Sequence, residues 1–102
     1  MRIISVKTLR QFWQRHADAE GALRAWYEVT EAVRWRSFME VRRTFRSADA
    51  VKVASGNTVT AFNIGGNKYR LVAAIHYNTG VVYALMVLTH QEYDAAGWRD
   101  RL

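Results

Sequence analysis

The stretch that decides the fold runs from Lys68 to His90 and reads KYRLVAAIHYNTGVVYALMVLTH. Residues 68–77 and 81–88 are both rich in β-branched and aromatic side chains, which favour strands. Between them lies Asn78-Thr79-Gly80, the clearest hairpin signal in the chain, because asparagine and glycine readily adopt the backbone conformations of tight turns. The sequence therefore predicts an antiparallel hairpin here.

A three-residue loop at 78–80 predicts a definite register for this hairpin. Counting back along the ladder gives the pairs Tyr77–Val81, Arg70–Leu88 and Lys68–His90. The polar side chains that then share one face are Lys68, Arg70, His76 and His90. The opposite face is apolar and carries Tyr69, Leu71, Ala73 and Ile75. We expect this apolar face to lie under helices, and a slip of one residue would destroy the arrangement.

Upstream of the hairpin, apolar residues recur at the spacing of an α-helix. On the first predicted helix, one side carries Leu9, Phe12, Trp13 and His16. Ser5 or Thr8 can cap it. A second helix begins at about Asp18, a suitable N-cap, and its apolar side carries Leu23, Trp26, Tyr27 and Thr30. A third covers about 38–45, because Ser37 and Glu40 have the spacing of a capping box.

After Ser47 the pattern changes to that of strands. Residues 51–53 and 59–64 read as extended segments joined by a tight loop, and Gly65-Gly66-Asn67 reads as the next turn. Thr89 and Glu92 repeat the capping-box spacing, which predicts a short C-terminal helix ending before Gly97. We therefore expect a single α+β domain over residues 1–102, with helices on one face of an antiparallel sheet and the other face free for function.

Composition excludes several classes of protein. The 102 residues include 15 Lys and Arg against 9 Asp and Glu, a formal charge of +6, and no cysteine. A disulfide scaffold, a thiolate metal site and a cysteine nucleophile are thereby excluded. The three histidines do not have metal-site spacing, and no nucleotide-binding glycine loop occurs, so we expect neither a metal nor a cofactor. No apolar run approaches the length of a membrane span, and we expect a cytoplasmic protein.

Arginines crowd the segment before the strands. They are Arg34, Arg36, Arg42, Arg43 and Arg46, with Glu40 as the one acid among them. Such a segment attracts polyanions, and arginine favours forked phosphate contacts. A solvated helix face or an acidic protein partner explains the same pattern, and composition does not decide among these readings.

Four residues supply the parts for cutting RNA without a metal: Lys68, Arg70, His90 and Tyr93. The reaction needs a proton acceptor for the ribose 2′-OH, cations for the charge that grows on phosphorus, and a proton donor for the leaving 5′-oxygen. A histidine can serve in either proton transfer, Arg70 suits the phosphate, Lys68 can hold a neighbouring phosphate, and Tyr93 can stack on a base or position a proton. A purely structural role for each residue is the alternative.

Two segments carry a family resemblance. Residues 62–72, FNIGGNKYRLV, followed by residues 89–94, THQEYD, resemble the HigB-type toxins of bacterial toxin–antitoxin systems, a branch of the RelE superfamily. The opening Arg2–Ser5, residues 19–27 and residues 45–49 are similar too. The resemblance thus covers nearly the whole chain and implies the RelE-like form of the α+β fold.

The resemblance implies an mRNA interferase that enters the ribosomal A site and cleaves the message there, without metal or cofactor. It implies a HigA-type helix-turn-helix antitoxin as partner, and contact with operator DNA only through the antitoxin complex. Matched residue by residue, the catalytic set becomes Arg70, Lys68, His90 and Tyr93, with Lys52 as a further candidate for RNA contact.

One position departs from the family pattern. Many relatives have a basic residue five positions before the histidine, where this chain has Leu85. Either that charge is dispensable, or the active cleft is weaker in this chain, or an arginine such as Arg42 or Arg43 supplies the missing cation.

The alternative to the toxin function is a non-catalytic basic module that binds RNA or DNA through phosphates.

Overall fold

The computed structural model describes residues 1–102 and places a helical half before a run of strands. The elements in chain order are β1 (Arg2–Ile4), α1 (Val6–Arg15), the 3-10 turn η1 (Ala17–Ala19), α2 (Glu20–Ala32), α3 (Phe38–Thr44), β2 (Asp49–Lys52), β3 (Thr58–Ile64), β4 (Tyr69–His76), β5 (Val81–Thr89), α4 (His90–Asp94) and the 3-10 turn η2 (Gly97–Arg101). The predicted α+β class is confirmed.

The five strands form one sheet in the order β1-β5-β4-β3-β2. Strands β2 to β5 are antiparallel neighbours, as predicted. Strand β1 pairs in parallel with β5 and makes the sheet mixed, which the sequence did not predict. Three residues are too short for a period-2 pattern to be recognised, so this edge strand depends on its partner for its identity.

The predicted register of the β4–β5 hairpin is confirmed at the Arg70 end and wrong at the turn. Arg70 lies opposite Leu88 as predicted, but His76, not Tyr77, lies opposite Val81. The ladder shifts between Val72 and Ala73 because β5 carries one extra residue there, a β-bulge. The turn is one residue longer than predicted, and the bulge adds one residue to β5. The two shifts in register cancel, so Arg70 lies opposite the predicted residue.

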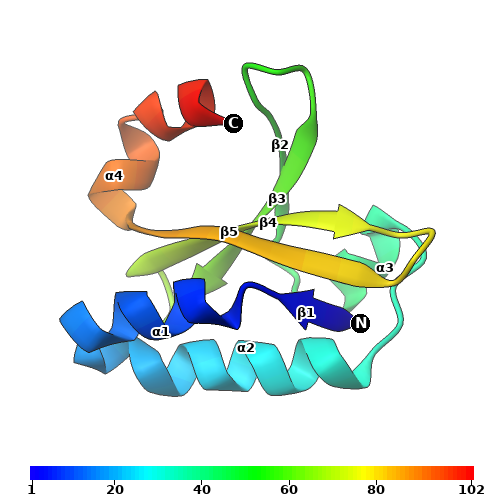
Figure 1. The fold of residues 1–102 in the computed structure, drawn as a ribbon, viewed down its shortest axis with the longest axis horizontal. Helices are drawn as coiled ribbons and strands as arrows, with labels where there is room; N and C mark the ends of the chain where they lie inside the picture. The colour runs from blue at the N-terminus through cyan, green and yellow to red at the C-terminus, as the bar shows by residue number, and fades with distance from the viewer.

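Helices α1 and α2 cover one face of the sheet, below it in Figure 1. The core between them includes Leu9, Phe12, Leu23, Trp26, Trp35, Phe62, Leu71 and Val82. Phe62 of β3 lies at its centre, with ring centroids 5.4 Å from Trp26, 5.4 Å from Phe45 and 6.1 Å from Trp35. The apolar face predicted for β4 is this face, since Tyr69, Leu71 and Ala73 belong to the same core.

The opposite face is only partly free, which corrects the prediction. Its core consists of Val51, Val53, Val59, Ala61, Val72, Leu88 and Trp98. The segment α4–η2 folds back over the sheet and supplies Trp98, and the backbone N–H of Ala54 donates to the Arg99 carbonyl at 3.1 Å. Figure 1 shows this C-terminal segment above the sheet, beside the β2–β3 hairpin.

Local capping signals are confirmed at two of the helix ends. Ser37 Oγ accepts from the N–H of Glu40, and Thr89 forms a complete capping box with Glu92. The predicted N-cap of the second helix is wrong, because α2 starts after Ala19 and the Asp18 carboxylate reaches across to β4. Ser5 occupies the N-cap of α1, but its side chain makes no capping hydrogen bond.

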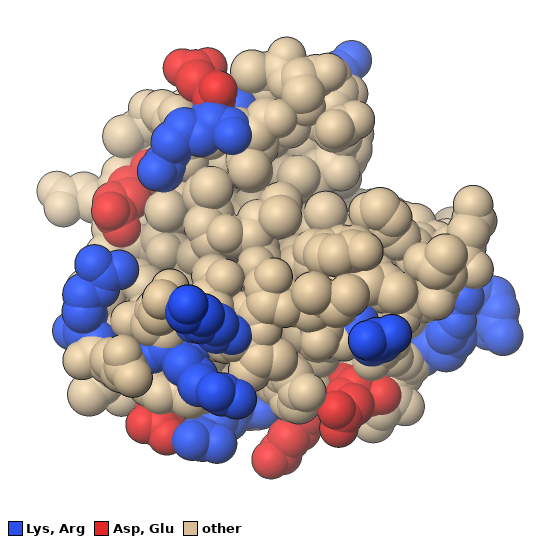
Figure 2. All heavy atoms as spheres, viewed as in Figure 1, with Lys and Arg blue, Asp and Glu red and all other residues tan.

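Charge is unevenly distributed over the helical layer. Helix α1 carries Lys7, Arg10 and Arg15 and no acid, whereas α2 carries three acids, Glu20, Glu28 and Glu31, and one cation, Arg24. Figure 2 shows basic side chains gathered over α1 and acidic ones along α2. None of the helices has the length and apolar character that crossing a membrane requires.

Candidate active site

The antiparallel pairing of β4 with β5 brings the backbone positions of the four predicted residues to one end of the sheet. The prediction that Lys68 and Arg70 share one face is wrong for their side chains, because Lys68 reaches Asp18 beside Tyr69 of the helix-covered core, whereas Arg70 lies against Tyr93. Lys68 and Arg70 lie at the start of β4, where β5 ends and α4 begins with His90. The backbone N–H of His90 donates to the Lys68 carbonyl at 3.0 Å, which extends the ladder by one pair as predicted. Tyr93 follows one helical turn later, so it lies on the same side of α4.

The Arg70 guanidinium is held by neutral partners. Its Nη2 donates to Asn67 Oδ1 at 2.5 Å and its Nη1 donates to the Tyr69 carbonyl at 3.2 Å. Its central carbon lies 5.5 Å from the centroid of the Tyr93 ring. The side chain is half-buried and no carboxylate pairs with it in the structure, so its charge remains available to an anion.

Lys68, Arg70, His90 and Tyr93 lie at the end of the sheet that we call the corner. Tyr93 connects this corner to the smaller core. Its ring stacks on Trp98 with centroids 5.2 Å apart, and Trp98 Nε1 donates to the Tyr93 carbonyl at 3.0 Å. Partial burial raises the pKa of the Tyr93 phenol, and the carboxylate of Asp49 raises it further. The phenol therefore remains protonated at neutral pH and can donate a hydrogen bond or a proton.

His90 has an acidic neighbour that the sequence analysis missed. Its Nε2 lies 3.0 Å from Asp94 Oδ2, one helical turn along α4. The i,i+4 spacing of His90 and Asp94 was visible in the sequence and is a known signal for such a pair on a helix. A partner at this distance limits the rotation of the imidazole ring.

Lys68 also has an acidic partner, and this one comes from a distant part of the chain. Its Nζ lies 2.6 Å from Asp18 Oδ2, and the hydroxyl of Tyr69 donates to Asp18 Oδ1 at 2.7 Å. The hydrogen bond and the charge of Asp18 raise the pKa of Lys68, while the bonds from Lys68 and Tyr69 lower the pKa of Asp18. No local pattern in the sequence predicts the Asp18–Lys68 pair, because the two residues are fifty positions apart.

The three residues predicted to contact RNA do not join the four. Val51 and Val53, on either side of Lys52, both belong to the smaller core, so strand alternation directs Lys52 to the opposite face of the sheet. Arg42 and Arg43 lie on α3, which Figure 1 shows at the opposite end of the molecule from α4. The structure therefore separates these three cations from Arg70.

The other positions of interest lie apart from the four as well. His76 ends β4 at the far side of the sheet, where its ring lies edge-on to Tyr83 with centroids 5.0 Å apart. Leu85 is the extra residue of the bulge and packs against the smaller core. Arg42 and Arg43 lie on α3 at the other end of the molecule from α4, so the structure does not bring either arginine beside the four candidate residues.

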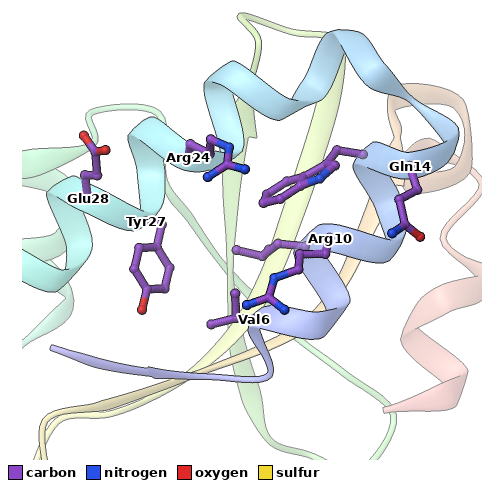
Figure 3. Close-up of a pocket in the computed structure, with 8 residues that line it drawn as sticks. Val6, Arg10, Gln14, Arg24, Tyr27 and Glu28 are labelled. Atoms are coloured by element: carbon purple, nitrogen blue, oxygen red, sulfur yellow. The ribbon is translucent and has the colours of Figure 1, made fainter.

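A hollow of about 410 Å3 lies between α1 and α2, away from this corner. Figure 3 shows Arg10 and Arg24 beside it, with Tyr27 and Glu28 on the α2 side. The Arg24 guanidinium lies 4.8 Å from the Trp13 ring centroid and pairs with Glu20 at 2.7 Å. The contact with Trp13 joins α2 to α1, whereas the pair with Glu20 lies within α2. The hollow contains none of the four candidate residues.

Comparison with known proteins assigns the chain to a family. The model of the HigB toxin family, described as the RelE-like toxic component of a toxin–antitoxin system, matches residues 19–96. The mRNA interferase toxin HigB of Escherichia coli K12 is 28% identical over 94 residues, which cover 92% of this chain and 88% of the relative. The mRNA interferases HigB of Escherichia coli O157:H7 and Shigella flexneri match with the same identity and coverage. The matched residues include both motifs and all four residues of the corner, and the chain belongs to the HigB family of RelE-like toxins.

Proposed function

We propose that this protein is a toxin that cleaves mRNA on the ribosome, in the A site, by a metal-independent reaction through the ribose 2′-OH. The observation that supports the proposal is the Arg70 guanidinium 5.5 Å from the Tyr93 ring, at the end of the sheet where α4 begins with His90. The names of the relatives, mRNA interferases, support the same substrate. A single domain over residues 1–102 performs the reaction.

The chemistry requires one bond to form and one to break. The 2′-oxygen attacks the adjacent phosphorus, the bond from phosphorus to the 5′-oxygen breaks, and the products are a 2′,3′-cyclic phosphate and a 5′-hydroxyl. Arg70 stabilises the charge that accumulates on the phosphoryl oxygens, because its guanidinium has no carboxylate partner. His90 transfers a proton, and Asp94 orients its imidazole.

Tyr93 and Lys68 complete the site. The Tyr93 phenol, held flat against Trp98, stacks on a base or assists a proton transfer. Lys68 holds a phosphate beside the scissile one. Which group is the base and which the acid follows from pH–rate profiles of the single variants.

The antitoxin that neutralises this toxin is, in our proposal, a HigA-type helix-turn-helix protein. Operator DNA is contacted only through the toxin–antitoxin complex, and the toxin acts in the cytoplasm. An excess of positive charge, +6 over the chain, suits a substrate embedded in ribosomal RNA.

Mapping of new mRNA 5′ ends on translating ribosomes tests the proposal. Wild type, Arg70→Ala and His90→Ala are compared, with Arg10→Ala, an exposed arginine on α1, as the matched control. We expect cleavage to slow by roughly 10² to 10³ for Arg70→Ala, the effect of losing one preorganised charge-stabilising donor. Equal cleavage by all four proteins would remove the assigned roles. Ribosome binding with intact messages would favour the non-catalytic RNA-binding module instead.

A further inference from the structure

The Asp18 carboxylate lies within reach of the proposed RNA site although it comes from the other half of the chain. It binds the Lys68 ammonium at 2.6 Å and accepts from the Tyr69 hydroxyl at 2.7 Å. We infer that Asp18 is a positioning residue that competes with RNA phosphate for Lys68 and thereby limits how tightly the toxin binds RNA. The inference rests on the proposed function, since it assumes that Lys68 meets RNA.

Tyr69 holds the competing carboxylate in place. The Tyr69 side chain is only 8% exposed, and its ring lies edge-on to Phe12 at 5.1 Å and to His16 at 5.6 Å. Phe12 and His16 in turn stack on each other with centroids 4.3 Å apart. Because the packed phenol cannot follow a moving partner, its hydroxyl fixes one oxygen of Asp18 and leaves the other oxygen directed at Lys68.

The two basic side chains at the start of β4 differ in their partners. Arg70 is held by an amide oxygen, a backbone carbonyl and an aromatic ring, none of which carries charge. Lys68 is held by a carboxylate, which has the same single negative charge as a phosphodiester. A phosphate must displace Asp18 or share the ammonium with it, so Lys68 contributes less to RNA binding than an unpaired lysine would.

The exposure of the pair makes this competition possible. The Lys68 and Asp18 side chains are 66% and 48% exposed, so RNA can approach the ammonium without any rearrangement of the core. An exposed ion pair is also weak enough to be exchanged for another anion. The pair therefore tunes affinity and does not block the site.

Asp18→Asn is the variant that isolates the charge. The asparagine retains an oxygen that can accept from the Tyr69 hydroxyl, but it no longer attracts the ammonium. Binding is measured with a 2′-O-methyl RNA oligomer, which cannot be cleaved because its 2′-oxygen has no proton to lose. We expect Asp18→Asn to bind about two- to fivefold more tightly, the range that corresponds to an exposed ion pair.

The salt dependence of binding provides a second readout. One additional phosphate contact to single-stranded RNA steepens the slope of log K against log salt by about 0.7. We expect this steeper slope for Asp18→Asn and not for Glu20→Gln. Glu20 is the matched control, because it lies two residues away and loses the same charge but pairs with Arg24 at 2.7 Å.

The double variant Asp18→Asn with Lys68→Met tests whether the gain in affinity depends on Lys68. We expect it to lose the whole gain that Asp18→Asn alone produces. An unchanged or weaker affinity for Asp18→Asn, an equal gain for Glu20→Gln, or a gain that persists in the double variant would overturn the inference. Thermal unfolding of each variant ensures that only folded protein is compared. RNA binding by the wild type with no gain for Asp18→Asn overturns only the role of Asp18, whereas no RNA binding by any variant overturns the proposed function as well.

Discussion

The two faces of the sheet are covered in different ways. On one face, α1 and α2 bury a large core in which Phe62, Trp26 and Trp35 pack ring against ring. On the other face, the short segment α4–η2 covers a smaller aliphatic core through Trp98 and leaves the corner with Arg70 exposed. Helices α1 and α2 have 10 and 13 residues, whereas α4 has five and covers less of its face. Arg70 and Tyr93 lie where this C-terminal cover ends.

Because of this difference, alternate residues of a single strand belong to the larger core or lie beside the candidate site. Along β4, Tyr69, Leu71 and Ala73 face the helices, and Arg70 and Val72 face the C-terminal segment. Alternation along a strand therefore allows neighbouring residues to serve the core and the site. The following variants test that separation, from the largest expected effect to the smallest.

Phe62→Ala removes the centre of the larger core. Because the ring is 1% exposed and contacts three other aromatic rings, we expect the free energy of unfolding to fall by about 3–5 kcal/mol. Denaturant titration measures this loss. Val29→Ala on the exposed side of α2 is the control and should change stability by less than about 0.5 kcal/mol. A loss for Phe62→Ala as small as that of the control would break the comparison.

Trp98→Ala removes the side chain that anchors the C-terminal segment. We expect a loss of about 3 kcal/mol, the lower end of the usual range, because a short terminal segment can move to fill part of the cavity. The Tyr93 ring also loses its stacking partner at 5.2 Å, so RNA cleavage should fall in protein that is still folded. Unfolding and cleavage are measured at the same temperature. Full cleavage activity after this substitution would show that Tyr93 does not need its support.

Thr89→Ala removes one half of the capping box at the start of α4. The Thr89 hydroxyl accepts from the Glu92 N–H at 3.1 Å, and its loss should cost about 1 kcal/mol. Hydrogen exchange at the Glu92 amide should accelerate, while exchange in α2 remains unchanged. Thr79→Ala, in the turn before β5, removes only a long contact to the His76 carbonyl and serves as control. Equal exchange rates in the two variants would contradict a role for the cap.

The Asp18–Lys68 pair predicts the smallest effect, and this effect depends on pH. The pKa of Asp18 is lowered in the folded protein, so its stabilising contribution is present above the ordinary pKa of about 4 and is lost as pH falls through the lowered value. The pKa of Lys68 is raised, so the contribution is lost again as pH rises through that value, above about 10. The Tm difference between wild type and Asp18→Asn should be present at pH 7 and disappear near pH 2. A difference that persists at pH 2 would mean that the charge of Asp18 is not its cause.

Much of the fold was predictable because its signals are local. The capping oxygens of Ser37 and Thr89 lie three residues from their partners, so spacing in the sequence translates directly into hydrogen bonds. The strands β3 to β5 were recognised from composition and turns. Strand β1, by contrast, is defined by its pairing with a segment almost eighty residues away, which no local pattern reveals.

The candidate site was predictable only in part. The facing of Arg70 and the proximity of Lys68 to His90 follow from counting along a ladder, although the count succeeded because a longer turn and a bulge at Leu85 cancel. Arg42 and Arg43 were grouped with the site on charge, and Lys52 on the family resemblance. Neither charge nor a match of single residues determines the face of a sheet or the end of a molecule on which a side chain lies.

The sequence by itself determined the α+β class, the helix caps at Ser37 and Thr89, the basic charge and the two motifs that resemble the HigB family. Only the tertiary structure decided which acids accompany the cations, with Asp18 on Lys68 and no carboxylate on Arg70. It also decided that Trp98 packs into the smaller core on the second face. The physical reason is range: hydrogen bonds between residues a few positions apart depend on spacing, whereas contacts across fifty residues depend on how the helices and the sheet pack.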